Sequence, residues 1–220
     1  MRIADSSLTC FAPGNFLLGG KALNRDDIFQ FGLNTVAGCH HAYNVTPAGI
    51  APERQFACNC NLTSVDWAWQ SSDTITEFPS INASAQWNSD ALWAIDSDYY
   101  LRPGLITLFS KLLIVETMES YFYAYRLTGN TTYQDWAWEA FEHIVAATKA
   151  PFGFSSITDV MSSDGGSKTN QQQSFFLAET LKYAYLIFDD PERISLDEWV
   201  LNTEAHPLRR GPQFSNVSSA

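Results

Sequence analysis

Helical periodicity dominates this chain and most constrains how it can fold. Residues 25–43 place Ile28, Phe31 and Val36 at helical spacing, and Asn24 can cap the segment. The same pattern recurs in three further segments, which we expect to be helices: 117–128, 132–149 and 172–188. Helices joined by short hairpins favour an α/α toroid over a bundle.

The segments outside these helices are short or polar. Residues 44–98 are rich in Asn, Ser, Asp and Pro, and we expect irregular structure there. We expect a hairpin from Pro151 to Val160, a short strand at 199–201, and a flexible tail at 209–220. The sequence therefore predicts an all-α fold with small β hairpins, with residues 1–208 in one domain.

The chain is acidic and rich in aromatic residues. Its 220 residues carry a formal net charge of -11 and include 7 Trp, 9 Tyr and 15 Phe. Negative charge argues against nucleic acids and anionic membrane surfaces as partners. Carboxylates and aromatic rings together suit a neutral, hydroxyl-rich ligand or a cation. The longest apolar run, Leu105–Val115, is interrupted by Ser110 and Lys111 and is too short to cross a bilayer.

Several features favour the secretory pathway. There are four cysteines, and Cys58 and Cys60 are too close in sequence for a usual zinc site. A disulfide would fit an oxidising compartment. N-glycosylation sequons begin at five positions: Asn44, Asn61, Asn82, Asn130 and Asn216. Five sequons in a chain this short favour entry into the secretory pathway.

Two pairs of side chains could contribute to a carbohydrate site. Phe175 and Glu179 are four residues apart, so a ring could pack on a sugar while the carboxylate accepts its hydroxyls. Glu116 and Glu119 are three apart at the start of an expected helix, and two inward carboxylates could hold metal-associated waters. Spacing alone favours simpler roles: a core Phe175, a solvated Glu179, and helix-start carboxylates at the other pair.

The segment Asn202–Pro207 is a polar turn after the expected strand at 199–201. It could present the oxygens of Thr203 to a hard cation such as calcium, with Glu204 beside it. The alternative is an ordinary turn, in which the threonine hydroxyl bonds its own backbone.

Six segments spread along the chain form one set. They are Leu8–Gly20 (LTCFAPGNFLLGG), Thr46–Glu53 (TPAGIAPE), Tyr100–Pro103 (YLRP), Glu116–Ser120 (ETMES), Phe175–Glu179 and Asn202–Pro207 (NTEAHP). In this order they resemble the motifs of the class I α-1,2-mannosidases, glycoside hydrolase family 47. Pro13 stands where the family has a glycine.

The resemblance implies a partial (α/α)7 barrel, a Ca2+ ion, and inverting removal of terminal α-1,2-linked mannose from high-mannose N-glycans. It implies an endoplasmic reticulum, Golgi or secreted location, and we expect a monomer. Cys10 and Cys39 match the family's disulfide pair. Thr203 matches the direct calcium ligand, Glu204 would hold the ion through water, and Glu116 is the candidate general base. Substrate contacts are implied for the other matched residues: Glu53, Arg102, Glu119, Phe175 and Glu179.

The chain also departs from the family. Residues 104–115 separate Pro103 from Glu116, which follow each other directly in the family, and this apolar insert is hypothesised to be translated intron. The family's general acid lies upstream of any residue here. We therefore expect the C-terminal part of a catalytic domain, with little or no turnover alone. The alternatives are a non-catalytic mannose-glycan-binding or glycoprotein quality-control module on the same fold, or a fragment that does not close its barrel.

Overall fold

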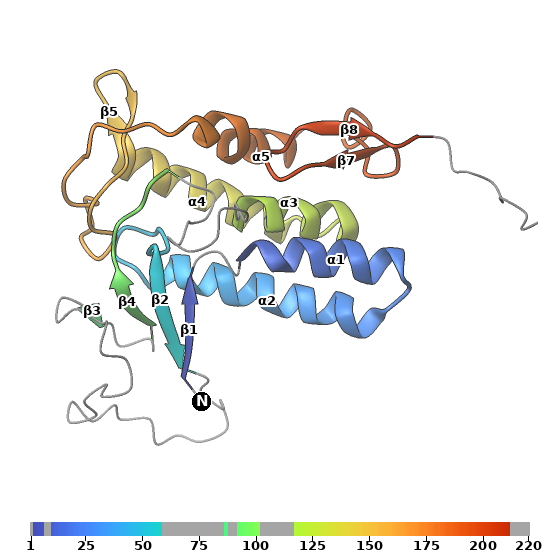
Figure 1. The fold of residues 1–220 in the computed structure, drawn as a ribbon, viewed down its shortest axis with the longest axis horizontal. Helices are drawn as coiled ribbons and strands as arrows, with labels where there is room; N and C mark the ends of the chain where they lie inside the picture. The colour runs from blue at the N-terminus through green and yellow to red at the C-terminus, as the bar shows by residue number, and fades with distance from the viewer. Residues whose placement is uncertain (1, 7–9, 59–85, 88–91, 102–116, 212–220) are drawn as a thin grey trace, which may run out of the picture.

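The computed structural model describes residues 2–6, 10–58, 86–87, 92–101 and 117–211. Helices make up most of it (Figure 1). In chain order they are α1 (Ala12–Ala22), α2 (Asp26–Asn44), α3 (Thr117–Thr128), α4 (Thr132–Thr148), the π-helical turn η2 (Phe176–Thr180) and α5 (Leu181–Leu186). The described helices are therefore consistent with the mostly helical fold expected from the sequence.

Three predicted helices, α2, α3 and α4, are confirmed to within one residue at each end. The predicted helix at 172–188 is present, but its first part is a π-helical turn. Helix α1 was not predicted, because Pro13 and several glycines give its segment low helix propensity.

Close packing against α2 explains how α1 forms. A Cβ atom on Gly20 would lie 2.7 Å from the backbone nitrogen of Phe29, and one on Gly32 would lie 3.0 Å from Leu17 Cγ. Glycine thus lets the two helices approach closely. The disulfide between Cys10 and Cys39, with 5.7 Å between the Cα atoms, joins the start of α1 to α2. This is the pair that the family resemblance implied.

A four-stranded antiparallel sheet lies at one end of the helices (Figure 1). Its strands are β1 (Arg2–Ser6), β2 (Arg54–Cys58), β3 (Gln86–Trp87) and β4 (Leu92–Asp96), in the order β1-β2-β4-β3. In the register, Arg2 faces Cys58 and Ala57 faces Leu92. This sheet was not anticipated, and β2, β3 and β4 fall in the segment for which irregular structure was expected.

Two small hairpins complete the described chain. Strands β5 (Lys149–Ala150) and β6 (Gly153–Phe154) form a hairpin after α4, with Gly153 at φ 95°; it begins and ends earlier than the hairpin expected from Pro151 to Val160. Strand β7 (Trp199–Leu201) is the predicted short strand, and it pairs with β8 (Pro207–Arg209). Strand β8 therefore includes Arg209, which the sequence assigned to the tail. The rest of that tail, from residue 212, lies outside the described residues.

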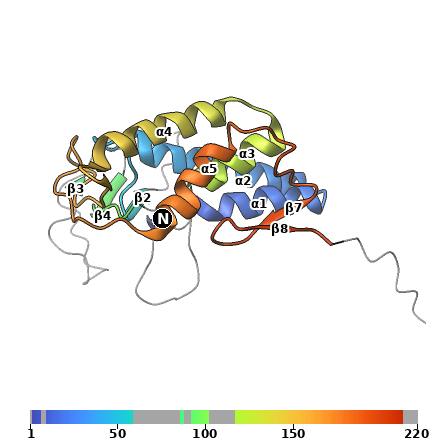
Figure 2. The same cartoon turned by 90° about the horizontal axis from the view of Figure 1, so that it is seen from above.

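Helix α3 is the centre of the core. Its residues from Thr117 to Ala124 are all buried, and the helix contacts α1, α2, α4 and α5 (Figure 2). The ring of Phe122 lies 5.5 Å from that of Tyr183 on α5, measured between centroids. A helix surrounded in this way holds its side chains in fixed positions, including any polar ones. The partial (α/α)7 barrel that the resemblance implies stays a prediction.

Candidate functional site

Glu119 lies in the first turn of α3, and its side chain is buried, with the residue only 5% exposed. The next residue holds this turn in place: the Ser120 hydroxyl donates to the backbone oxygen of Cys10 and accepts from the backbone nitrogen of Gly14. The disulfided start of α1 therefore fixes the helix turn that carries Glu119. The carboxylate lies in the first turn, as a helix-start role requires, but it is buried rather than solvated.

A second carboxylate, Glu179 on η2, faces the same interior and is 0% exposed. The pKa of Glu119 is raised to about 8: burial raises it most, the Tyr183 hydroxyl partly offsets this by favouring the charged form, and the charge of Glu179 raises it further. The solvated Glu179 favoured by spacing alone is thus wrong. Two carboxylates and a tyrosine hydroxyl meet between α3 and the η2–α5 segment.

The π-helical turn determines how this second carboxylate is presented. In η2 the backbone nitrogen of Leu181 donates to the oxygen of Phe176, five residues earlier. Phe175, just before the turn, is half-buried, whereas Glu179 is fully buried. π-helical turns of this kind often occur at functional sites. The ring and the carboxylate therefore differ in exposure, although they are four residues apart.

A second cluster of polar residues lies near Glu53, which is 3% exposed. The backbone nitrogen of Glu53 donates to the backbone oxygen of Asp98 at 3.1 Å. The hydroxyl of Tyr100 donates to Asp98 Oδ2 at 2.7 Å, and this bond, with burial and nearby carboxylates that include Glu53, raises the pKa of Tyr100. Burial raises the pKa of Asp98 as well. The Asp98 carboxyl group and the Tyr100 phenol therefore lie together in the residues just before Leu101, and Glu53 bonds to the same segment.

The turn 202–206 is exposed, and Asn202 holds it in place. Its Oδ1 accepts from the backbone nitrogens of Glu204 and His206 at 3.0 and 2.9 Å. Thr203 and Glu204 lie at its tip with exposed side chains, while Ala205 is buried at φ 55°. Side-chain bonding of this kind fixes a turn without a hydrophobic core.

Two hydrogen bonds join the η2–α5 segment, which carries Glu179, to the segment of Tyr100 and to the turn 202–206. Thr180, next to Glu179, donates from its hydroxyl to the backbone oxygen of Leu101 at 3.2 Å. Lys182 donates from Nζ to the backbone oxygen of Ala205 at 2.9 Å. The structure thus brings the segments of Tyr100 and Thr203 against the helix that carries Glu179. Arg102, Glu116 and the insert 104–115 lie outside the described residues.

Sequence reasoning missed several residues that build this arrangement: Tyr183, Thr180, Lys182 and Asn202. A signal existed for Tyr183, which is four residues after Glu179. Another existed for Asn202, because Asn at a turn start commonly bonds the following backbone nitrogens. For Thr180 and Lys182 no local signal exists, since both bond to segments distant in sequence.

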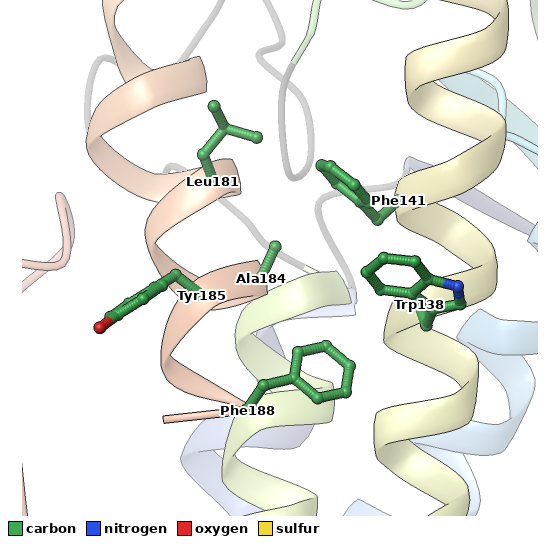
Figure 3. Close-up of a pocket in the computed structure, with 6 residues that line it drawn as sticks. All are labelled: Trp138, Phe141, Leu181, Ala184, Tyr185 and Phe188. Carbon is green, nitrogen blue, oxygen red and sulfur yellow. The ribbon is translucent and has the colours of Figure 1, made fainter. Parts of the chain in front are cut away.

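An apolar groove elsewhere is separate from these carboxylates. It has a volume of about 240 Å³ and lies between α4 and α5 (Figure 3). Its walls are made by six residues: Trp138, Phe141, Leu181, Ala184, Tyr185 and Phe188. None of them is a carboxylate, so the groove does not supply the acid-base groups.

The site residues that the structure describes offer hard oxygens: the buried Glu119 and Glu179 carboxylates, and the exposed Thr203 on the turn that Lys182 holds against α5. Two adjacent buried carboxylates favour a cation nearby, because each opposes the other's charge. Calcium prefers such oxygen ligands. Within the described ranges, no group of three or more His, Cys, Asp or Glu side chains could hold a metal directly.

Comparison with known proteins gives a consistent result. The model of "Glycosyl hydrolase family 47" matches residues 2–210. The chain is 37% identical over 212 residues to mannosyl-oligosaccharide alpha-1,2-mannosidase 1B of Aspergillus phoenicis, covering 94% of this chain and 36% of that protein. It is 40% identical over 210 residues to the mannosyl-oligosaccharide alpha-1,2-mannosidase of Coccidioides posadasii, covering 92% of this chain and 34% of that protein.

A solved structure is similar as well. The alpha-1,2-mannosidase from Trichoderma reesei superposes with a TM-score of 0.74 at 34% identity, covering 94% of this chain and 39% of that one. This chain thus spans little more than a third of the length of the proteins it matches. The family match over residues 2–210, with these relatives, shows that the chain belongs to glycosyl hydrolase family 47.

Proposed function

We propose that this chain forms part of the active site of a calcium-dependent, inverting α-1,2-mannosidase of the secretory pathway. Its substrate would be terminal α-1,2-linked mannose of high-mannose N-glycans. The observation that carries the proposal is the buried pair Glu119 and Glu179 with Tyr183, at the meeting point of the segments that match the family. Carboxylates held in an interior of this kind can accept sugar hydroxyls in a fixed orientation.

The residues of the chain have distinct proposed roles. Glu119 and Glu179 accept hydroxyls of the mannose, and the half-buried ring of Phe175 packs on its apolar side. Glu53 and Arg102 complete the contacts to the sugar. Because Glu119 has a pKa of about 8, it holds a proton near neutral pH until a cation or a sugar hydroxyl changes its surroundings.

Inverting hydrolysis needs two proton transfers. Glu116, as general base, takes a proton from the water that attacks the anomeric carbon, and a general acid gives a proton to the leaving oxygen as its bond to that carbon breaks. No residue of this chain is proposed as that acid. The chain alone should therefore turn over slowly or not at all.

Calcium would be held by Thr203 directly and by Glu204 through water. Bound there, it would polarise nearby oxygens and favour the ionised forms of the surrounding carboxylates. The bonds that Asn202 makes keep the Thr203 turn in one shape, and Lys182 keeps that turn against α5. These contacts would hold Thr203 and Glu204 in position whether or not the ion is bound.

The decisive experiment uses a chimera in which this chain replaces the matched part of the Trichoderma reesei enzyme, with and without residues 104–115. Hydrolysis of α-1,2-mannobiose is measured with calcium and with a chelator. We expect hydrolysis by the chimera without the insert, loss of at least about 100-fold in Glu116→Gln, and little turnover by the chain alone. Calcium-dependent binding without hydrolysis would contradict the proposal and favour a binding module.

Two controls sharpen this experiment. Robust hydrolysis by the isolated chain, abolished by Glu116→Gln, would show that the missing proton donor is present in it after all. Because residues 104–115 separate Pro103 from Glu116, the insert should move Arg102 away from Glu116 and lower activity; equal activity of chimeras with and without it would contradict this. Glu198→Gln is a matched control, because Glu198 is an exposed carboxylate paired with the exposed Arg209.

A further inference from the structure

A glycosylation sequon, Asn130-Thr131-Thr132, forms the turn between α3 and α4, and all three residues are exposed. The Oδ1 atom of Asn130 accepts from the backbone nitrogen of Thr132 at 3.1 Å. Both polar atoms of the carboxamide are on one carbon, so the nitrogen points away from the contact that the oxygen makes. That nitrogen is the atom to which a glycan would be attached.

The turn around Asn130 is well defined and remote from the carboxylate pair. Gly129, at φ 70°, donates from its backbone nitrogen to the oxygen of Tyr125 at 2.8 Å and ends α3. Glu119 is in the first turn of this helix and Asn130 follows its last, a separation of roughly 16 Å along the axis. Figure 2 shows the turn at the end of the helices away from the four-stranded sheet. A glycan there would not obstruct the buried carboxylates.

The sequon at Asn44 gives an internal contrast. Asn44 Nδ2 lies 2.9 Å from His40 Nε2, and the His40 ring stacks on Trp136 with 3.9 Å between centroids. The hydroxyl of Thr46, the third sequon residue, is buried in bonds to the backbone oxygens of Tyr43 and Ile50. This sequon is therefore accessible to a transferase only before α2 and its following turn fold.

We propose that Asn130 carries an N-linked glycan in the folded protein, and that Asn44 carries one in a much smaller fraction of chains. The donor is a lipid-linked diphosphate oligosaccharide. The bond formed joins Asn130 Nδ2 to the anomeric carbon of the first sugar, and the bond broken joins that carbon to the diphosphate oxygen. One amide proton is released and the lipid diphosphate leaves, so no oxidant or reductant is needed. In the cell this rests on the secretory location proposed above.

The test directs the chain into microsomes with an added secretory leader, so the result does not depend on the proposed location of the natural protein. The chain is translated behind a cleavable secretory leader in the presence of microsomal membranes, and only protease-protected chains are analysed. Glycosidase treatment in heavy-oxygen water, followed by mass spectrometry, gives occupancy at each sequon. Thr132→Ala removes the sequon, while Thr131→Ala is the matched control, because the Thr131 side chain makes no capping hydrogen bond to α4.

We expect occupancy at Asn130 in the wild type and in Thr131→Ala, and its loss in Thr132→Ala. In chains with the Cys10–Cys39 disulfide formed, occupancy at Asn130 should exceed that at Asn44 several-fold. Protected chains without sugar at Asn130 would overturn the proposal, as would equal occupancy at both sites. Neither result bears on mannosidase activity, which the chimera assay tests separately.

Discussion

Two parts of the candidate site are held in place by different physics. The Glu119–Glu179 pair is enclosed by α3 and the η2–α5 segment, beside the fully buried Tyr183. The Thr203 turn is exposed and is fixed by two backbone hydrogen bonds that Asn202 Oδ1 accepts and by one that Lys182 donates. Packing positions the first part, and a few polar contacts position the second.

The difference shows where burial has a cost. Enclosing two carboxylates destabilises their charged forms, so the interior part depends on pH and on any cation present. The exposed turn has a single carboxylate, that of Glu204, and it is open to solvent, so substitutions there should change stability little when no cation is bound. Substitutions in the two parts should therefore have different sizes and different pH dependence.

The largest effect is expected from the interior. Tyr183→Ala should lower the free energy of unfolding by about 3–5 kcal/mol, because it empties a buried site packed against the ring of Phe122. Thr203→Ala on the exposed turn should change it by less than about 0.5 kcal/mol. Urea unfolding of both variants measures the contrast, and Tyr183→Phe controls for loss of the hydroxyl alone. Similar losses in the two alanine variants would refute the distinction.

The next effect is a pH dependence. The folded-state pKa of Glu119, about 8, lies above its unfolded value, so the folded chain binds the extra proton and stability falls as pH rises from about 4.5 to 8. Glu119→Gln should remove this loss and stabilise the chain at pH 7 by roughly 3 kcal/mol without calcium, with no gain near pH 4.

Thermal unfolding across that pH range tests the sign. Asp98 also has a pKa raised by burial, so a smaller slope of the same direction should remain in Glu119→Gln. Glu204→Gln, on the exposed turn, is the control and should leave the profile unchanged. If the stability of Glu119→Gln relative to the wild type were instead greatest at acid pH, Glu119 would be charged and stabilised in the folded chain.

A smaller effect is expected in the turn itself. Asn202→Ala removes the acceptor for two backbone nitrogens, those of Glu204 and His206, and should cost about 1–2 kcal/mol. Amide hydrogen exchange at these two residues should speed up about tenfold or more. Asn202→Asp keeps an acceptor oxygen and should stay near the wild type. Unchanged exchange in Asn202→Ala would mean that other contacts hold the turn.

The smallest effect concerns the link between the two parts. Lys182→Met keeps the length of the side chain but loses the bond from Nζ to the backbone oxygen of Ala205, and should cost about 1 kcal/mol. Exchange should rise at Ala205 and His206 but not in α3. A loss as large as that of Tyr183→Ala would show that the turn and the interior unfold together.

Local pattern predicted the regular helices well. Helices α2, α3 and α4 follow from apolar spacing and from the breaks between them, which are properties of nearby residues. Helix α1 and the four-stranded sheet did not follow, because glycines and polar residues mask their periodicity. Their formation depends on partners distant in sequence, such as the β1–β2 pairing of Arg2 with Cys58.

The candidate site was only partly predictable for the same reason. Spacing pointed to Glu119 and Glu179 as candidates but favoured a helix-start role for the first and a solvated charge for the second, since nothing local signals burial. Only the family resemblance ranked them as site residues. The contacts of Thr180 and Lys182 join segments that are far apart in the chain, and no short motif encodes them.

The π-helical turn η2 has a consequence for insertions and deletions. A turn closed over five residues contains one residue more than an α-helical turn closed over four. Deleting a single residue from η2 would let an ordinary α-helical turn close in its place, so Lys182 and Tyr183 beyond it would keep roughly their present orientation. Deleting a residue from a regular turn of α3 would instead rotate everything beyond it by about 100°. The chain should therefore tolerate the loss of one residue from η2 better than the loss of one residue from α3.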